Sequence, residues 1–75
     1  MKYVYEIENG RTGETEFSLF SSMDKALAEA KSLLALQCKA SRVKTDRFAT
    51  SGFAFGYDDH DQRVGWYAIN RRHVE

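Results

Sequence analysis

Few side chains in this chain of 75 residues could do covalent chemistry. Cys38 is the only cysteine, and it falls on the apolar stripe of a helical pattern, where a cysteine acts as a small buried hydrophobe rather than as a nucleophile. Neither His60 nor His73 is placed beside it by the sequence. The pattern therefore predicts a protein without catalytic residues or a cofactor, and not an enzyme.

Asp58, Asp59 and Asp61 surround His60 and make the one cluster of metal-ligand types. A hard cation needs several oxygens at defined offsets, and a calcium loop also needs a glycine and a distant bidentate glutamate, which this segment lacks. Aspartate favours turns, so we expect a solvated hairpin turn and no metal site. Asp58 and Asp59 remain candidates for acidic contacts with a partner.

Basic residues gather in the segment that follows the helical pattern: Lys39, Arg42, Lys44 and Arg47. In a strand, Arg42 and Lys44 share one face and Arg47 lies on the other. Two interpretations stay open for this segment. It is a solvated edge strand, in which lysine discourages aggregation, or it contacts an acidic protein surface or a phosphate backbone.

The elements that must position these residues follow from the spacing of apolar side chains. Residues 3–8 and 14–20 alternate between apolar and polar positions around Asn9-Gly10, which predicts a hairpin with a loop of about four or five residues. Phe17 and Leu19 share one face of the second strand.

A helix is predicted over about residues 22–38, because apolar residues recur there every three or four positions. Ser21-Ser22 offers a hydroxyl to cap this helix, and if Ser21 is the N-cap, Asp24 lies at the third helical position and can complete a capping-box-like arrangement. Leu36 lies on the opposite side of this helix from the stripe, so it must be exposed, cover a loop or touch a partner.

Three further strands are expected, at residues 41–48, 53–57 and 64–70, and we expect residues 71–75 to fray. The whole chain is then one compact α+β domain of order ββαβββ, spanning residues 1–75, in which the helix packs on one face of an antiparallel sheet. A single helix leaves the other face to solvent or a partner.

The chain has five Phe, four Tyr and one Trp, more than one small core needs, so several should lie on the uncovered face. Aromatic residues are frequent hot spots of protein interfaces, and Tyr57 and Trp66 are the expected anchors. A domain of this size buries only about 60% of its unfolded surface. A partner subunit, or a second copy in a homodimer, is therefore expected to support it.

Charge and hydropathy narrow the class of partner. The formal net charge is zero, which argues against a dedicated nucleic-acid binder and equally against a strongly acidic DNA mimic. Charges interrupt the N-terminal residues, and no apolar run is long enough to span a membrane. Together with the lone cysteine, which suits a reducing compartment, these features predict a cytoplasmic protein with no membrane partner.

One short segment resembles a nucleic-acid-binding signature. Gly52-Phe53-Ala54-Phe55 is similar to the centre of the RNA-recognition motif, in which strand aromatics stack on bases. Ser51 stands where that motif has a basic residue, and the motif's βαββαβ order needs a second helix. A small sheet-based nucleic-acid-binding module is therefore the alternative function.

Across most of its length the chain resembles the small phage-encoded type I anti-CRISPR proteins that have a sheet-plus-helix fold. The similar features are the opening Lys2-Tyr3 to Ile7, residues 26–33 of the helix, and the aromatic, acidic, basic and tryptophan residues from Phe53 to Trp66. The resemblance implies a non-catalytic inhibitor that binds a host Cas protein or ribonucleoprotein complex. Such a protein blocks target-DNA binding or nuclease recruitment by the CRISPR surveillance complex in the host bacterial cytoplasm. Another phage regulatory interaction protein stays open.

Overall fold

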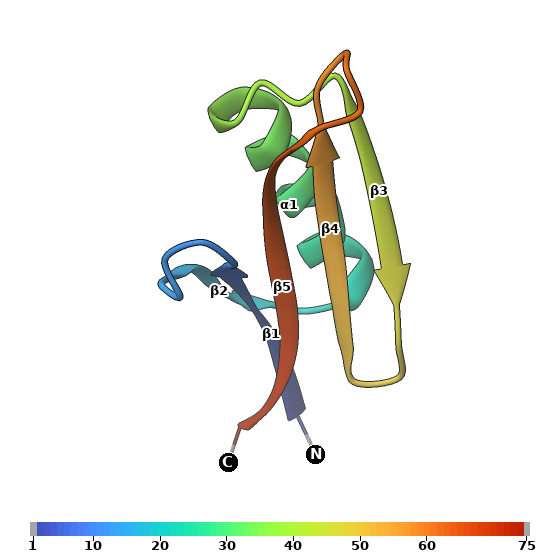
Figure 1. Cartoon of the computed structure of the whole chain (residues 1–75). Helices are drawn as coiled ribbons and strands as arrows, with labels where there is room; N and C mark the ends of the chain where they lie inside the picture. Colours follow the sequence, from blue (N-terminus) through green and yellow to red (C-terminus); the bar gives the residue numbers. More distant parts are fainter. Residues whose placement is uncertain (1, 75) are drawn as a thin grey trace.

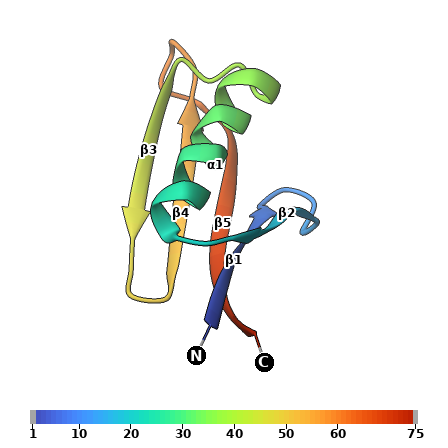
Figure 2. The same ribbon diagram turned by 180° about the vertical axis from the view of Figure 1, so that it is seen from behind.

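The computed structural model describes residues 2–74, without the side chains of residues 2, 16–19 and 74. The elements are β1 (Lys2–Asn9), β2 (Thr15–Phe20), α1 (Met23–Gln37), β3 (Arg42–Arg47), β4 (Ser51–Tyr57) and β5 (Arg63–Val74). The strands form one antiparallel five-stranded sheet of order β2-β1-β5-β4-β3. Helix α1 lies across one face of this sheet (Figures 1 and 2). The predicted α+β class and the ββαβββ order are confirmed, whereas the expected faces of Phe17 and Leu19 lie outside the described side chains.

The apolar stripe of α1 is buried as its spacing predicts, and the second of the two adjacent serines caps the helix. The stripe consists of Met23, Ala26, Leu27, Ala30, Leu33 and Leu34. Ser22, not Ser21, is the N-cap: its backbone is extended and its hydroxyl accepts a hydrogen bond of 3.2 Å from the Lys25 backbone N–H. Asp24 is therefore at the second helical position, and its carboxylate pairs with Arg47 of β3 instead of completing a capping box.

Helix α1 packs directly on the backbone of β4 and β5, because small residues lie beneath it. Gly56 of β4 is paired with Gly65 of β5. A Cβ atom added to Gly56 would lie 2.9 Å from the Ala40 Cβ atom, and one added to Gly65 would lie 2.7 Å from the Cys38 Sγ atom. Larger side chains at either glycine would push the end of α1 away from the sheet.

The core lies between α1 and the three central strands. Leu34 from the helix, Ile7 from β1 and Ile69 from β5 are fully buried there, and Tyr67 is 1% exposed. The Tyr67 hydroxyl reaches the helix C-terminus, where it donates a hydrogen bond of 3.4 Å to Gln37 Oε1. This contact gives the phenol a polar partner at the border of an otherwise apolar core.

Strand β5 is longer than the sequence pattern predicts. The expectation that residues 71–75 fray is wrong for the described part, because β5 continues to Val74 and pairs with β1 back to Lys2. The guanidinium of Arg71 lies 4.0 Å from the centroid of the Tyr3 ring, which rests against His73. Backbone pairing and a cation–π contact thus hold a segment whose composition looks like a solvated tail.

Substituting Gly56 by alanine tests the close approach of α1 to the sheet. We expect Gly56→Ala to lower the free energy of unfolding by about 1–3 kcal/mol, the usual cost of overpacking, as measured by urea denaturation. Ala40→Gly in the same chain removes the nearest obstructing atom, so the double variant should recover part of the loss. A fully additive double variant would contradict this packing.

Candidate partner-binding face

The sheet face turned away from α1, which we call the open face, has no helix on it (Figure 1). Strand β4 alternates strictly, with Gly52, Ala54 and Gly56 buried beneath the helix. Its other side chains, Phe53, Phe55 and Tyr57, lie on the open face. Pairing of the strands then places Trp66 of β5 directly opposite Phe55. The prediction that several aromatic residues lie on the uncovered face is confirmed.

Three of these aromatic residues form a continuous surface, which we call the aromatic platform: Phe53, Phe55 and Trp66. The ring centroids of Phe53 and Phe55 are 6.0 Å apart at an interplanar angle of 18°. Those of Phe55 and Trp66 are also 6.0 Å apart, at 23°. All three side chains are half-buried. The platform therefore has well-ordered rings that still have contact with solvent.

Two neighbours extend the platform. Phe48, in the β3–β4 turn, meets Phe53 edge to face at a centroid distance of 6.1 Å and is 56% exposed. Ala68 of β5 faces Phe53 and is 8% exposed although it lies on the side without a helix. Burial of this small residue on an open sheet face follows from the large rings around it.

The indole of Trp66 lies across Gly10 of the β1–β2 loop. The Gly10 backbone N–H donates a hydrogen bond of 2.9 Å to the Trp66 carbonyl oxygen, which continues the pairing of β1 with β5. A Cβ atom on Gly10 would overlap the Cε2 and Cδ2 atoms of the indole. Glycine is required here because the ring occupies the space of its side chain. One side of the indole is thus covered by backbone, and its exposed surface is on the side away from Gly10.

Cationic side chains border the Phe55–Trp66 end of the platform. Lys44 of β3 is directly opposite Phe55, and the Arg63 guanidinium carbon is 5.9 Å from the Phe55 ring centroid. A hollow of about 400 Å³ beside Trp66 is lined by Arg63 and by Arg11 of the β1–β2 loop, with Val64 and Gly65. None of the three cations forms a salt bridge with a carboxylate of the described residues.

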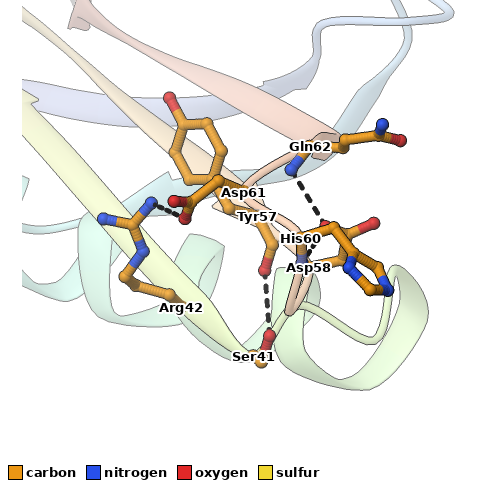
Figure 3. Close-up of polar contacts among 7 residues, drawn as sticks. All are labelled: Ser41, Arg42, Tyr57, Asp58, His60, Asp61 and Gln62. Carbon is orange, nitrogen blue, oxygen red and sulfur yellow. Dashed lines mark hydrogen bonds and ion pairs between the residues drawn. The ribbon is translucent and has the colours of Figure 1, made fainter.

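Arg42 differs, because its charge is already paired. Its Nη2 atom lies 2.6 Å from Asp61 Oδ1, and its guanidinium carbon is 5.0 Å from the Tyr57 ring centroid. Figure 3 shows the three side chains together at the β4–β5 turn. Both members of the ion pair are more than half exposed, so the pair orients Arg42 and Tyr57 without contributing much stability.

The four predicted basic residues do not form one patch. Arg42 and Lys44 lie on the open face, as their spacing predicts. Arg47 lies on the helix-covered face and pairs with Asp24. Lys39 is exposed in the α1–β3 connection, where its φ is 56°. Of the eight nominated partner-binding residues, the open face brings together Arg42, Lys44, Tyr57 and Trp66.

The acidic segment is a structured turn, as expected. Asp58 Oδ1 accepts hydrogen bonds of 2.8 Å from the His60 backbone N–H and 2.9 Å from that of Gln62 (Figure 3). Asp61 adopts a φ of 59°, and Asp59 is exposed. Among the side chains that the structure describes, no group of three or more His, Cys, Asp or Glu is placed to hold a metal ion. Asp58 has a structural role, which leaves Asp59 as the freer acidic contact.

Cys38 ends α1 rather than lying in a reactive site. Its backbone N–H donates to the Leu34 carbonyl oxygen at 3.2 Å, and its Sγ atom faces Gly65. The thiol is half-buried against the core. This placement is that of a packing residue at the helix C-cap.

Sequence reasoning left several residues of this face out of the nominated set: Gly10, Arg11, Phe48, Phe53, Phe55 and Arg63. The motif resemblance pointed to Phe53 and Phe55, since it places aromatics on one side of a strand. Arg11 and Gly10 have no comparable signal, because only the pairing of β1 with β5 brings the hairpin loop beside Trp66.

Comparison with known proteins gives no relative: no protein-family model, curated protein or solved structure matches the chain. Among the described residues, no helix has both the length and the apolar character needed to cross a membrane.

Substituting each of two adjacent aspartates separates a structural from a contact role. Asp58→Ala removes two hydrogen bonds to backbone N–H groups and should lower the free energy of unfolding by about 1–2 kcal/mol. Asp59→Ala should change it by less than about 0.5 kcal/mol, as at most surface positions. Urea denaturation of both variants measures this. Equal effects would show that Asp58 does not hold the turn.

Trp66 is the single tryptophan, so its fluorescence tests whether the indole packs against Gly10. Gly10→Ala should displace the indole and shift its emission maximum to longer wavelength, because the ring loses its cover. Gly13→Ala is the matched control: it lies in the same loop, has a φ of 76°, and has no atom within 4 Å of the added Cβ. It should cost stability through backbone strain and leave the emission unchanged. Unaltered emission from Gly10→Ala would refute the arrangement.

Proposed function

We propose that the protein is a non-enzymatic inhibitor that binds a CRISPR surveillance complex through its open face. In this proposal it acts inside a bacterial host and blocks target-DNA binding or nuclease recruitment. The observation that carries the proposal is the aromatic platform with its cationic border, because no other element of the described chain covers it. The resemblance to small type I anti-CRISPR proteins supplies the identity of the partner.

The composition of the open face is that of a protein–protein contact surface. Tryptophan, tyrosine and arginine are the residue types that most often dominate interface energetics, and Trp66, Tyr57 and Arg42 all lie here. The rings are held by neighbouring side chains and by strand pairing, so little conformational entropy is lost when a partner covers them. Cys38 and Asp58 belong to residue types that often act in catalysis, but here Cys38 packs against Gly65 and Asp58 accepts hydrogen bonds within a turn.

The cationic border suits a nucleoprotein partner. Among the described side chains, no carboxylate forms a salt bridge with Lys44, Arg63 or Arg11. Unneutralised charges at the rim of an interface raise the rate of association with a surface of opposite sign. Acidic Cas surfaces and the phosphates of a guide RNA both provide such a surface.

The proposal is tested with purified type I surveillance complexes loaded with guide RNA. The tagged protein should be retained at fixed stoichiometry on at least one complex. Its addition should abolish either binding of labelled target duplex or recruitment of the nuclease. If no complex in the panel is retained or inhibited, the proposal is wrong.

Charge reversal locates the contact on the open face. Arg42→Glu with Lys44→Glu should weaken binding to the inhibited complex about tenfold or more, since it replaces attraction with repulsion. Lys25→Glu with Lys31→Glu, on the exposed side of α1, makes the same change in net charge and should leave affinity within about threefold. Equal losses in both variants would show that net charge, not this face, matters.

A further inference from the structure

The aromatic platform has a geometry that suits nucleic-acid bases as well as protein side chains. Phe55 and Trp66 are adjacent rings on neighbouring strands, inclined by only 23° to each other. Trp66 lies across Gly10, which covers one side of the indole, and its side chain is still partly exposed to solvent. Rings presented in this way on a sheet stack with unpaired bases.

The charges around these two rings are arranged for phosphate. One row across the sheet runs from Lys44 through Phe55 and Trp66 to Gly10, as strand pairing shows. Cations flank this row: Lys44 at one end, and Arg63 with Arg11 around the hollow at the other. No acidic side chain is among the described residues that line that hollow.

Two carboxylates of the same face are paired with arginines, and two others lie one row away from Phe55 and Trp66. Asp61 is engaged by Arg42, and Glu6 by Arg72 at 3.2 Å. Asp46 is opposite Phe53, and Glu8 opposite Ala68, which is the next row of the sheet. The zero net charge of the chain therefore hides a locally cationic half of the open face, the half that contains Phe55 and Trp66.

We propose that this half of the open face binds single-stranded nucleic acid, with unpaired bases stacked on Phe55 and Trp66. The phosphates of the strand contact Lys44 on one side and Arg63 and Arg11 on the other. Recognition by stacking does not depend on base identity, because every base has a flat face. The inference does not rest on the proposed function, since it requires no Cas protein.

The first experiment titrates the purified full chain with unstructured oligonucleotides. A thymidine 12-mer and a uridine 12-mer serve as probes, and Trp66 fluorescence and the anisotropy of a labelled oligonucleotide are the readouts. Stacking on the only tryptophan should quench its emission in step with the rise in anisotropy. A duplex of the same length should bind at least about tenfold more weakly, because its bases are paired and inaccessible.

The salt dependence of the oligonucleotide affinity measures how many phosphates the protein contacts. Three cations contacting a single strand predict a slope of about −2 in log K against log salt. Affinity should therefore fall roughly fifteen- to twentyfold between about 50 mM and 200 mM salt. Arg63→Gln should reduce the magnitude of the slope by about 0.7, whereas Arg47→Gln, which removes a cation from the helix-covered face, should leave it unchanged.

Aromatic variants separate stacking from folding. Phe55→Leu keeps an apolar side chain over the sheet but removes the ring, so affinity should fall about five- to a hundredfold. Tyr3→Leu makes the same kind of change on the other face, beneath Arg71, and should leave affinity unchanged. Urea denaturation of both variants confirms that they are folded.

Three results would overturn the inference. They are no quenching at about 50 mM salt, equal affinity for duplex and single strand, and equal losses in Phe55→Leu and Tyr3→Leu. If oligonucleotides do not bind but Phe55→Leu abolishes capture of a surveillance complex, the open face is a protein interface. That result rejects this inference and leaves the proposed function standing. If oligonucleotides bind but no surveillance complex is captured, this inference stands and the proposed function is rejected.

Discussion

The close approach of α1 to the backbone of β4 and β5 dictates how side chains are distributed between the two faces of the sheet. Gly52 leaves room for Met23 and Leu27, and Gly56 leaves room for Leu34 and Ala40, to lie close to the sheet backbone. Side chains alternate between faces along a strand, so the bulky residues of β4 must then lie on the opposite side. A single alternation of small and aromatic residues thus seats the helix and builds the aromatic platform.

That division gives the two faces different physical roles. The covered face buries Ile7, Tyr67 and Ile69 in an apolar core, and none of the described charged residues is buried. The open face keeps its rings half-buried by packing them against each other and across Gly10. Exposing apolar rings to water is unfavourable in free energy, and a partner that covers them removes this penalty. Their retention in a domain with a small core supports a binding role for this face.

The charges close to Phe55 and Trp66, rather than the net charge of the chain, determine the electrostatic character of this part of the open face. Three ion pairs among the described residues neutralise Arg42, Arg47 and Arg72, and the cations beside Phe55 and Trp66 stay unneutralised. Because charges separated by more than about 8 Å are screened at physiological ionic strength, a partner responds to this neighbourhood and not to the formal zero of the chain.

The order of the elements could be predicted from the sequence alone, as could the buried stripe of α1 and the aromatic side of β4. Those features depend on spacing within one segment, which is 3.6 residues for the helix and two for the strand. The sequence could not show whether Ser21 or Ser22 is the N-cap. Adjacent serines offer the same hydroxyl, and the backbone conformation determines which of them caps the helix. The length of β5 could not be predicted from the sequence either, since strand pairing with β1 outweighs the polar composition of residues 71–74.

The set of residues that meet on the open face depends on how distant segments of the chain pack together. Arg11 and Gly10 join Trp66 because β1 and β5 are neighbours in the sheet although they lie at opposite ends of the chain. Arg47 leaves the predicted patch because it is on the other side of β3, within reach of Asp24. Contacts between distant segments depend on strand order and register, and no local spacing encodes either of them.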